Sequence, residues 1–405
     1  MNSRQAVIVP RSSRRASWFP PAIAREPLTH AGARTSIGPL FFGTTPPSPV
    51  LGFGAWAIGG GGWGEPESES ERLAAIQMAR ERGVSFFDTA PTYGDGTSER
   101  LLGQALKPYR DRVSIATKIG PRDDPRRSLE DSLRRLDTDF VDVIQLHEAL
   151  ERWEWQLETL HTLVVEGKAR AIGLCNATAP QLRRALEIAP VKSFQAAYNL
   201  FDRDIEQREL PLCRERGLAV LAYRPLAAGL LAGKYDAPPA FSPGDHRARI
   251  YWFKGAEFER RRSVIEQLRP LAVAVGGGLT IAALALRWLL SREGVTVVLA
   301  GARNRQQVEE NLAALVGRLP ADLVATIDAL VADVFRLPRA GASALQQAES
   351  WGARERFIVE RLDGTRSAEA IAAEWTDRGE APMVAAQVKV FADQMLERGL
   401  LQEVQ

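Results

Sequence analysis

The chain is poor in cysteine and has no long apolar run. Its 405 residues include two cysteines, Cys175 and Cys213, which are far apart and have no second pair beside them. A disulfide framework and a zinc site are therefore not expected, and free thiols indicate a reducing compartment. No segment approaches the roughly 20 apolar residues that span a bilayer. The sequence thus predicts a cytoplasmic protein with no metal ion and no membrane partner.

Charge of one sign is also scarce, because the net charge is only +2. Such a balance gives no general argument for a nucleic-acid partner. The first 35 residues are the exception, with six arginines against one acid. The stretch Ser13–Phe19 is similar to a twin-arginine export signal, but prolines and charges interrupt the apolar region that should follow. We therefore predict a flexible basic extension over residues 1–35.

From about residue 48, short apolar runs alternate with longer amphipathic stretches that have helical spacing. Repeated βα units of this kind predict a parallel sheet covered by helices. The count of about eight strands favours a closed (β/α)8 barrel over an open doubly wound sheet, although the pattern alone leaves both open. The predicted strands lie near Leu51–Ala57, Val84–Phe87, Val113–Ala116, Phe140–Ile144, Ala169–Gly173, Phe194–Ala196, Leu218–Ala222 and Thr296–Leu299.

Local signals mark where helices begin and where the barrel ends. Asp124 followed by Pro125 has the form of an N-cap and a first helical residue. Asn304 with Gln307 three residues later has the form of a capping pair. The last barrel helix is expected to end near Arg336, before a Pro- and Gly-containing linker. These boundaries predict a barrel over residues 36–337 and a small, mainly helical unit over residues 342–405.

Four ionisable side chains follow three successive predicted strands: Asp88 and Tyr93, then Lys118, then His147. In a barrel, the carboxyl ends of the strands form the active-site face. Hydride delivery to a carbonyl leaves an alkoxide that needs a proton. Tyrosine is a weak acid at neutral pH, but a neighbouring ammonium lowers its pKa, and a carboxylate holds that ammonium in place. These side chains therefore predict a carbonyl reduction.

In order and context, Asp88, Tyr93, Lys118 and His147 resemble the catalytic tetrad of the aldo-keto reductase family. The resemblance covers roughly residues 36–335 and includes the runs Leu51–Trp56 and Ser128–Leu136. It implies that Tyr93 is the general acid, Lys118 its activator, Asp88 the partner of Lys118, and His147 the residue that orients the substrate.

The resemblance also implies an NADPH site. Asn176 and Gln195 would hold the nicotinamide carboxamide and Tyr223 would stack on its ring. Gly229–Lys234 would follow the pyrophosphate, and Arg303 with Gln307 would bind the adenosine 2′-phosphate. Cys175 and Arg224 depart from the family's usual residues in ways that could change the affinity for the cofactor. Gly301 stands where some family members have a lysine, which leaves the preference for NADP over NAD open. The full set is Asn176, Gln195, Tyr223, Arg224, Leu226, Gly229, Lys234, Gly301, Arg303, Gln307, Glu310 and Asn311.

The glycine run Gly59–Gly62 lacks the G-x-G-x-x-G arrangement of a dinucleotide fingerprint. We interpret it as a loop at the barrel mouth, where Trp56 and Trp63 would contact the substrate; Trp153 and Trp155 could also line that face.

The C-terminal unit suggests a second function. Leu362–Ala372 and Leu396–Leu401 resemble small PqqD-like domains, which bind a precursor peptide, often by strand addition. Seven basic and ten acidic residues over 354–405 argue against DNA binding.

Three hypotheses therefore remain. The first is a reductase of small carbonyl compounds, whose residues could also run the reverse alcohol oxidation. The others are a non-catalytic nucleotide-binding scaffold and a tailoring reductase for a peptide- or carrier-bound substrate.

Overall fold

The computed structural model describes residues 50–334, 339–340, 353–359, 361–362, 367–377, 387–389, 391–392, 395 and 401–402. The predicted basic extension over residues 1–35 lies outside the described residues, as do Arg336 and most of the predicted linker. Among the described residues, no helix combines the length and the hydropathy needed to cross a bilayer.

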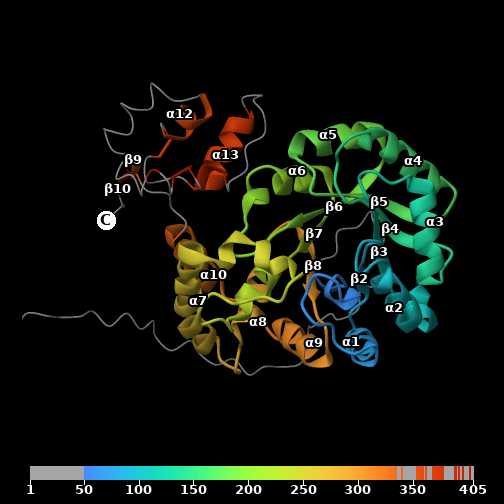
Figure 1. Ribbon diagram of the computed structural model, residues 1–405, viewed down its shortest axis with the longest axis horizontal. Helices are drawn as coiled ribbons and strands as arrows, with labels where there is room; N and C mark the ends of the chain where they lie inside the picture. Colours follow the sequence, from blue (N-terminus) through green and yellow to red (C-terminus); the bar gives the residue numbers. More distant parts are fainter. Residues whose placement is uncertain are drawn as a thin grey trace, which may run out of the picture. The chain divides into compact units, whose positions relative to one another are not determined.

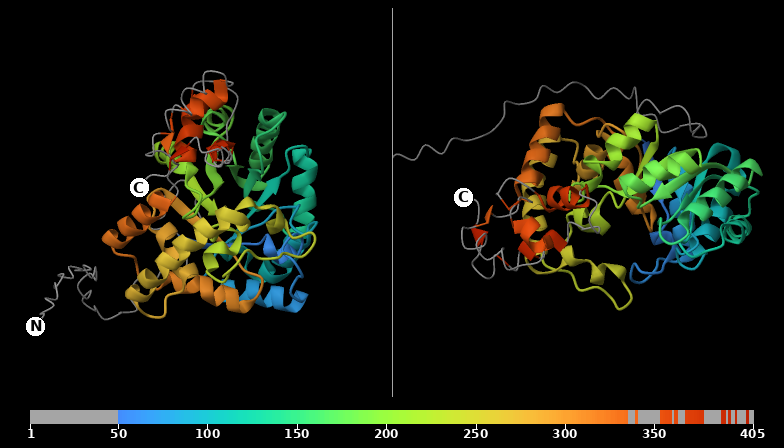
Figure 2. Two further views of the ribbon diagram at one scale, coloured as in Figure 1. Left: turned by 60° about the vertical axis from the view of Figure 1, so that its left-hand side comes forward. Right: turned by 90° about the horizontal axis from the view of Figure 1, so that it is seen from above.

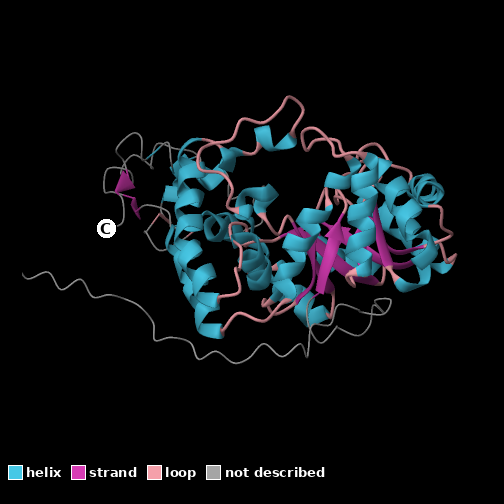
Figure 3. Cartoon of the chain, turned by 90° about the horizontal axis from the view of Figure 1, so that it is seen from below, coloured by secondary structure: helices cyan, strands magenta, loops and turns pink. Residues whose placement is uncertain are grey.

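Eight parallel strands form a closed barrel in which each strand pairs with the next and β8 returns to β1. The (β/α)8 prediction is therefore confirmed and the open sheet is excluded. Figure 3 shows the strands enclosed by helices. The strands are β1 (Val50–Gly54), β2 (Phe86–Asp88), β3 (Ser114–Ile119), β4 (Val141–Leu146), β5 (Ala169–Cys175), β6 (Val191–Ala197), β7 (Ala219–Tyr223) and β8 (Val295–Gly301).

The helices that follow the strands cover the outside of the barrel (Figure 1). They are α1 (Glu69–Glu81), α2 (Thr97–Leu106), α3 (Pro125–Leu136), α4 (Trp153–Val165), α5 (Ala179–Ile188), α6 (Glu209–Arg216), α7 (Gly255–Val275), α8 (Ile281–Leu290), α9 (Arg305–Leu312) and α10 (Ala321–Val334). α10 packs against α7, as Figure 2 also shows.

The predicted helix starts are correct, with one difference in detail. The Asp124 side chain accepts a hydrogen bond from the amide of Arg127, and Pro125 is the first helical residue of α3. The Asn304 side chain accepts from the amide of Gln307, at 3.0 Å, and caps α9. The Gln307 side chain accepts from the amide of Arg303 rather than from that of Asn304.

Two apolar layers hold the barrel together. The larger one lies between strands and helices, and the smaller one fills the barrel interior with Phe86, Ala116, Val143, Leu221, Val297 and Leu299. Successive side chains of a strand point to opposite faces, so the next inward position lies two residues further on. On β2, β3 and β4 these positions are Asp88, Lys118 and Gln145. Strand periodicity therefore aims the candidate catalytic residues into the carboxyl end of the barrel.

A network of charged and aromatic side chains fastens α10 to the barrel. The carboxylate of Asp328 accepts hydrogen bonds from Trp288 at 2.9 Å, Arg203 at 2.9 Å and Arg292 at 2.8 Å. Both arginines also bind Glu206, which precedes α6. Because Trp288 is fully buried, its indole N–H needs this acceptor.

The C-terminal part contains β9 (Arg339–Ala340), α12 (Ala353–Val359), α13 (Ala368–Asp377) and β10 (Leu401–Gln402). β9 pairs with β10, so two residues of the predicted linker form a strand instead. The Ser367 side chain caps α13 by accepting a hydrogen bond from the amide of Ala370. The buried apolar side chains of this part, among them Ile371, Trp375, Val388 and Met395, pack into one cluster. Residues 363–366 and 396–400, which carry much of the PqqD-like motif, lie outside the described residues.

The Asp328 network generates a stability prediction. We expect Asp328→Ala to lower the free energy of unfolding by about 1–3 kcal/mol, because the Trp288 donor and two guanidinium groups lose an acceptor. Urea unfolding followed by circular dichroism measures this. Asp322→Ala, in the exposed first turn of the same helix, is the control and should cost less than about 1 kcal/mol. Equal losses in both variants would contradict the role of the network.

Candidate active site

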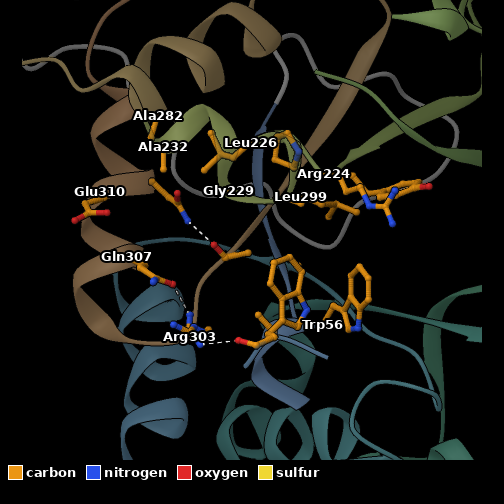
Figure 4. A pocket seen from close by; sticks show the side chains of 18 of the residues that line it. Trp56, Arg224, Leu226, Gly229, Ala232, Ala282, Leu299, Arg303, Gln307 and Glu310 are labelled. Atoms are coloured by element: carbon orange, nitrogen blue, oxygen red, sulfur yellow. Dashed lines mark hydrogen bonds between the residues drawn. The ribbon is translucent and has the colours of Figure 1, made fainter. Parts of the chain in front are cut away.

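One pocket opens at the carboxyl ends of the strands, and most of the predicted site residues line it (Figure 4). Lys118, His147, Asn176 and Gln195 are not among the lining residues and lie directly beside or beneath them. The predicted residues that line the pocket are Trp56, Trp63, Asp88, Tyr93, Tyr223, Arg224, Leu226, Gly229, Lys234, Gly301, Arg303, Gln307, Glu310 and Asn311.

The ammonium of Lys118 is at the centre of the site. It is buried and donates to Asp88 Oδ2 at 2.7 Å, to the carbonyl of Thr89 at 2.8 Å and to the hydroxyl oxygen of Tyr93 at 3.2 Å. An ammonium has three hydrogens, so these bonds use all of them. Because the Tyr93 oxygen accepts from Lys118, the tyrosine proton is free to be donated to another molecule.

The carboxylate of Asp88 is bound on its other side by two amides. Its Oδ1 accepts from Gln195 Nε2 at 2.7 Å and from Gln145 Nε2 at 3.2 Å. In this structure the amide nitrogen of Gln195, which we predicted to hold the nicotinamide carboxamide, is therefore engaged by Asp88. Gln145 was not predicted, although it lies two residues before His147 and pairs in register with Lys118. Strand periodicity could have found it.

The acidity of Tyr93 differs from the prediction. Burial raises the pKa of Tyr93 to about 12, and the opposing effect of the Lys118 charge does not overcome it. We expected the ammonium to lower this pKa. Burial would also lower the pKa of Lys118, but the nearby Asp88 carboxylate raises it above its usual value. Both groups are therefore protonated at neutral pH, and Tyr93 keeps the proton that it could donate.

His147 follows β4, and its ring lies edge-on to that of Tyr93, with 6.1 Å between centroids. Burial, together with the charge of Lys118, lowers its pKa to about 3. The imidazole is therefore neutral over the whole physiological range. A neutral imidazole can donate one hydrogen bond without competing for the proton of Tyr93.

Two glycines allow the Tyr93 turn to approach the first loop. Gly94 has φ +61°, and a Cβ there would lie 1.9 Å from the carbonyl oxygen of Gly59. A Cβ on Gly59 would lie 2.6 Å from the backbone of Tyr93. This close contact fixes the backbone of Tyr93 against the loop after β1. The glycine run thus has a packing role as well as its predicted place at the barrel mouth.

Asn176 and Tyr223 lie beside His147, at the ends of β5 and β7. The hydroxyl of Tyr223 donates to Asn176 Oδ1 at 2.9 Å, and Asn176 Nδ2 donates to the carbonyl of His147 at 3.1 Å. Asn176 has φ +54°, a left-handed conformation that asparagine tolerates better than most residues. These contacts connect His147 to the predicted nicotinamide end of the pocket.

The predicted adenosine end is formed by β8, α9 and the loop after β1. The Arg303 guanidinium donates to the carbonyls of Trp63 and Glu65, at 3.0 and 3.2 Å, and Asn311 donates to the carbonyl of Gly301. Burial lowers the pKa of Lys234, and the charges of Arg247 and Arg303 lower it further. Three cations close enough to affect one another favour an anionic ligand at this end.

The loop before α7 supplies groups that the sequence did not predict. Arg247 lines the pocket and pairs with Asp245, at 2.6 Å. The His246 ring contacts those of Trp56 and Trp63, with centroids 4.4 and 4.3 Å away. These residues lie in a loop without periodicity, so no local signal could have placed them.

Trp153 and Trp155, which we expected could line this face, belong to α4 and do not line the pocket. Trp153 packs on the core, and Trp155 is partly exposed beneath Arg152. Within the part of the chain that the structure describes, no group of three His, Cys, Asp or Glu side chains is placed to hold a metal ion.

Comparison with known proteins agrees with this geometry. The chain is 35% identical over 275 residues to the aldo-keto reductase YhdN of Bacillus subtilis, covering 64% of this chain and 82% of the relative. It is 34% identical over 301 residues to an NADH-specific methylglyoxal reductase of Escherichia coli, covering 65% and 89%.

Solved structures match over the barrel as well. A glycerol dehydrogenase from Gluconobacter oxydans gives a TM-score of 0.64 at 31% identity and covers 72% of this chain and 93% of its own. An aldo/keto reductase from Klebsiella pneumoniae in complex with NADP and acetate gives 0.56 at 29% identity, covering 70% and 92%. The model of the aldo/keto reductase family matches residues 50–332. The chain therefore belongs to the aldo/keto reductase family and is a nicotinamide-dependent oxidoreductase.

Proposed function

We propose that the chain reduces an aldehyde or ketone to an alcohol with NADPH, and that Asp88, Tyr93, Lys118 and His147 perform the proton chemistry. The observation that carries this proposal is the use of all three Lys118 hydrogens. One of these bonds goes to the oxygen of Tyr93, which leaves the tyrosine hydrogen available for a substrate. A non-catalytic scaffold has no need of this arrangement.

Bound NADPH supplies the hydride that adds to the carbonyl carbon. Tyr93 gives its proton to the carbonyl oxygen as that oxygen gains negative charge, so the product is an alcohol. Lys118 stabilises the phenolate that remains, and Asp88 holds Lys118 charged. Solvent then returns a proton to Tyr93. The reverse sequence oxidises an alcohol through the same residues.

His147 orients the substrate in this proposal. Its neutral imidazole lies edge-on to the Tyr93 ring, where it can donate a hydrogen bond to the carbonyl oxygen. That bond would fix the oxygen within reach of the Tyr93 hydroxyl. Positioning of this kind reduces the entropic part of the barrier.

The residues at the far end of the pocket fit a dinucleotide phosphate. Lys234 and Arg303 supply positive charge, and Gly229, with φ +93° and no heavy atom within 4 Å of a Cβ, leaves open space for a phosphate group. We assign Gly229 and Lys234 to the pyrophosphate and Arg303 and Gln307 to the adenosine 2′-phosphate. Asn176, Gln195 and Tyr223 would contact the nicotinamide, and Gly301, Glu310 and Asn311 would contact the adenosine. Leu226 would contact the part of the cofactor between them.

Three further features of the protein are also part of the proposal. The protein is cytoplasmic, residues 342–405 form a small helical PqqD-like unit, and this unit delivers a peptide-bound substrate to the barrel. The apolar cluster around Ile371 and Trp375 supports a unit with its own core.

The role of Tyr93 can be tested by removing its hydroxyl. We expect Tyr93→Phe to lower kcat for aldehyde reduction by about 10²–10⁴-fold, because the alkoxide loses its proton donor. NADPH oxidation at saturating aldehyde measures kcat, and fluorescence titration shows whether NADPH still binds. Tyr109→Phe is the control, since Tyr109 packs under Arg80 and does not line the pocket. A Tyr93→Phe enzyme with normal kcat would refute the assignment.

The protonation state of His147 predicts the shape of the pH profile. Its pKa is lowered from 6.5 to about 3, so the ring stays neutral until the pH falls towards 3. We therefore expect kcat/KM for reduction to show no His147 limb between about pH 5 and about pH 8. A limb near the ordinary histidine pKa that disappears in His147→Gln would show that the ring titrates normally.

The choice of cofactor depends on Arg303 in this proposal. We expect Arg303→Ala to raise the Kd for NADPH by about 10- to 100-fold through lost charge-assisted hydrogen bonds, with little effect on NADH. Tryptophan-fluorescence titration with both nucleotides measures this. Arg305→Ala is the matched control, because Arg305 pairs with Glu71 and does not line the pocket. Equal weakening of both nucleotides would show that Arg303 does not read the 2′-phosphate.

A further inference from the structure

Arg224 follows β7 directly and places its guanidinium at one end of the pocket. Its Cζ lies 5.8 Å from the centroid of the Trp56 ring and 5.5 Å from that of Tyr223. Figure 4 shows Arg224 on the opposite side of the pocket from Gln307 and Glu310. We predicted Arg224 as a cofactor residue, but its side chain lies away from the predicted adenosine end.

The indole of Trp56 lies between the Arg224 guanidinium and the catalytic Tyr93. It stacks on the Tyr93 ring with 5.9 Å between centroids, and both rings line the pocket. A molecule whose carbonyl oxygen reaches the Tyr93 hydroxyl can therefore extend along Trp56 towards Arg224. Trp63, which is edge-on to Trp56 at 5.1 Å, forms part of the same wall. The wall suits a flat or apolar spacer.

Apart from the two aromatic rings, the Arg224 guanidinium has no hydrogen-bond acceptor and no carboxylate partner among the residues that the structure describes. Arg247 pairs with Asp245, and Arg303 donates to two backbone carbonyls, whereas no hydrogen bond or ion pair involves the Arg224 guanidinium. Its Nε is buried and unpaired. A buried donor without an acceptor costs about 1–3 kcal/mol. The arrangement is therefore one that an incoming acceptor would stabilise.

The neighbouring imidazole of His246 carries no negative charge that could pair with Arg224. His246 contacts the Trp56 ring, burial lowers its pKa, and the positive charge of Arg224 lowers it further. It is therefore neutral at physiological pH. A guanidinium presents a planar fork of donors that matches a carboxylate in two parallel hydrogen bonds.

We propose that Arg224 is a specificity-determining residue that binds a carboxylate of the substrate, so that the enzyme prefers aldehydes or ketones with a carboxylate remote from the reacting carbonyl. This inference rests on the proposed function and names the substrate class of the same site. Arg224 then contacts the substrate rather than the cofactor, and Trp56 supports the spacer between the two polar ends.

The test compares 4-carboxybenzaldehyde with methyl 4-formylbenzoate, which share a ring and an aldehyde and differ in charge. We expect wild-type enzyme to have the higher kcat/KM for the acid. In Arg224→Met the acid-to-ester ratio of kcat/KM should fall by about 10- to 100-fold, and Arg224→Lys should restore part of it. All three side chains have a Cβ, so the backbone conformation at φ +52° meets the same strain.

Arg249→Met is the matched control, because Arg249 is an exposed arginine of the neighbouring loop that does not line the pocket. It should leave the ratio unchanged. Equal loss on acid and ester in Arg224→Met, with a raised Kd for NADPH, would assign Arg224 to the cofactor and overturn the inference. A wild-type enzyme that reduces the ester at least as well as the acid would overturn it while leaving the proposed function intact. If no aldehyde is reduced, the proposed function fails and the inference fails with it.

Discussion

The buried ammonium of Lys118 is the constraint around which the site is organised. A charge removed from water costs several kcal/mol unless a counter-charge and hydrogen bonds replace its hydration. Asp88, the carbonyl of Thr89 and the hydroxyl of Tyr93 replace it here. Asp88 in turn needs Gln145 and Gln195. One buried cation on β3 therefore fixes side chains from three other strands and from the loop that carries Tyr93.

Burial at the same end of the barrel also explains why Tyr93 and His147 each remain in one protonation state at neutral pH. Burial raises the pKa of Tyr93 and lowers that of His147, so one keeps its proton and the other stays uncharged. A donor and a neutral hydrogen-bonding group can then face the same oxygen. Away from this centre, the pocket carries positive charge at both ends: Arg303 lies at one end and affects the pKa of Lys234, and Arg224 lies at the other.

The parts of the fold and of the site that depend on local or periodic sequence patterns could be predicted. The eight strands, the caps at Asp124 and Asn304 and the inward positions of Asp88 and Lys118 follow from hydrophobic pattern and strand alternation. The lowered acidity of Tyr93 could not be predicted, since it depends on how deeply neighbouring segments bury the ring. Arg247 and His246 were missed because their place at the pocket depends on contacts with the first loop, which is distant in the sequence.

Hydrophobic periodicity is enough to predict the barrel and the order in which its polar residues meet the carboxyl ends of the strands. Periodicity alone decides which residues face inward, because parallel strands bring equivalent positions to one face. Which of those residues touch, which of them keep their protons and which charges lack a carboxylate partner depend on the packing of the whole fold. Those properties depend on burial and on distances between segments far apart in the chain, such as Trp56, Arg224 and His246, and no local pattern encodes them.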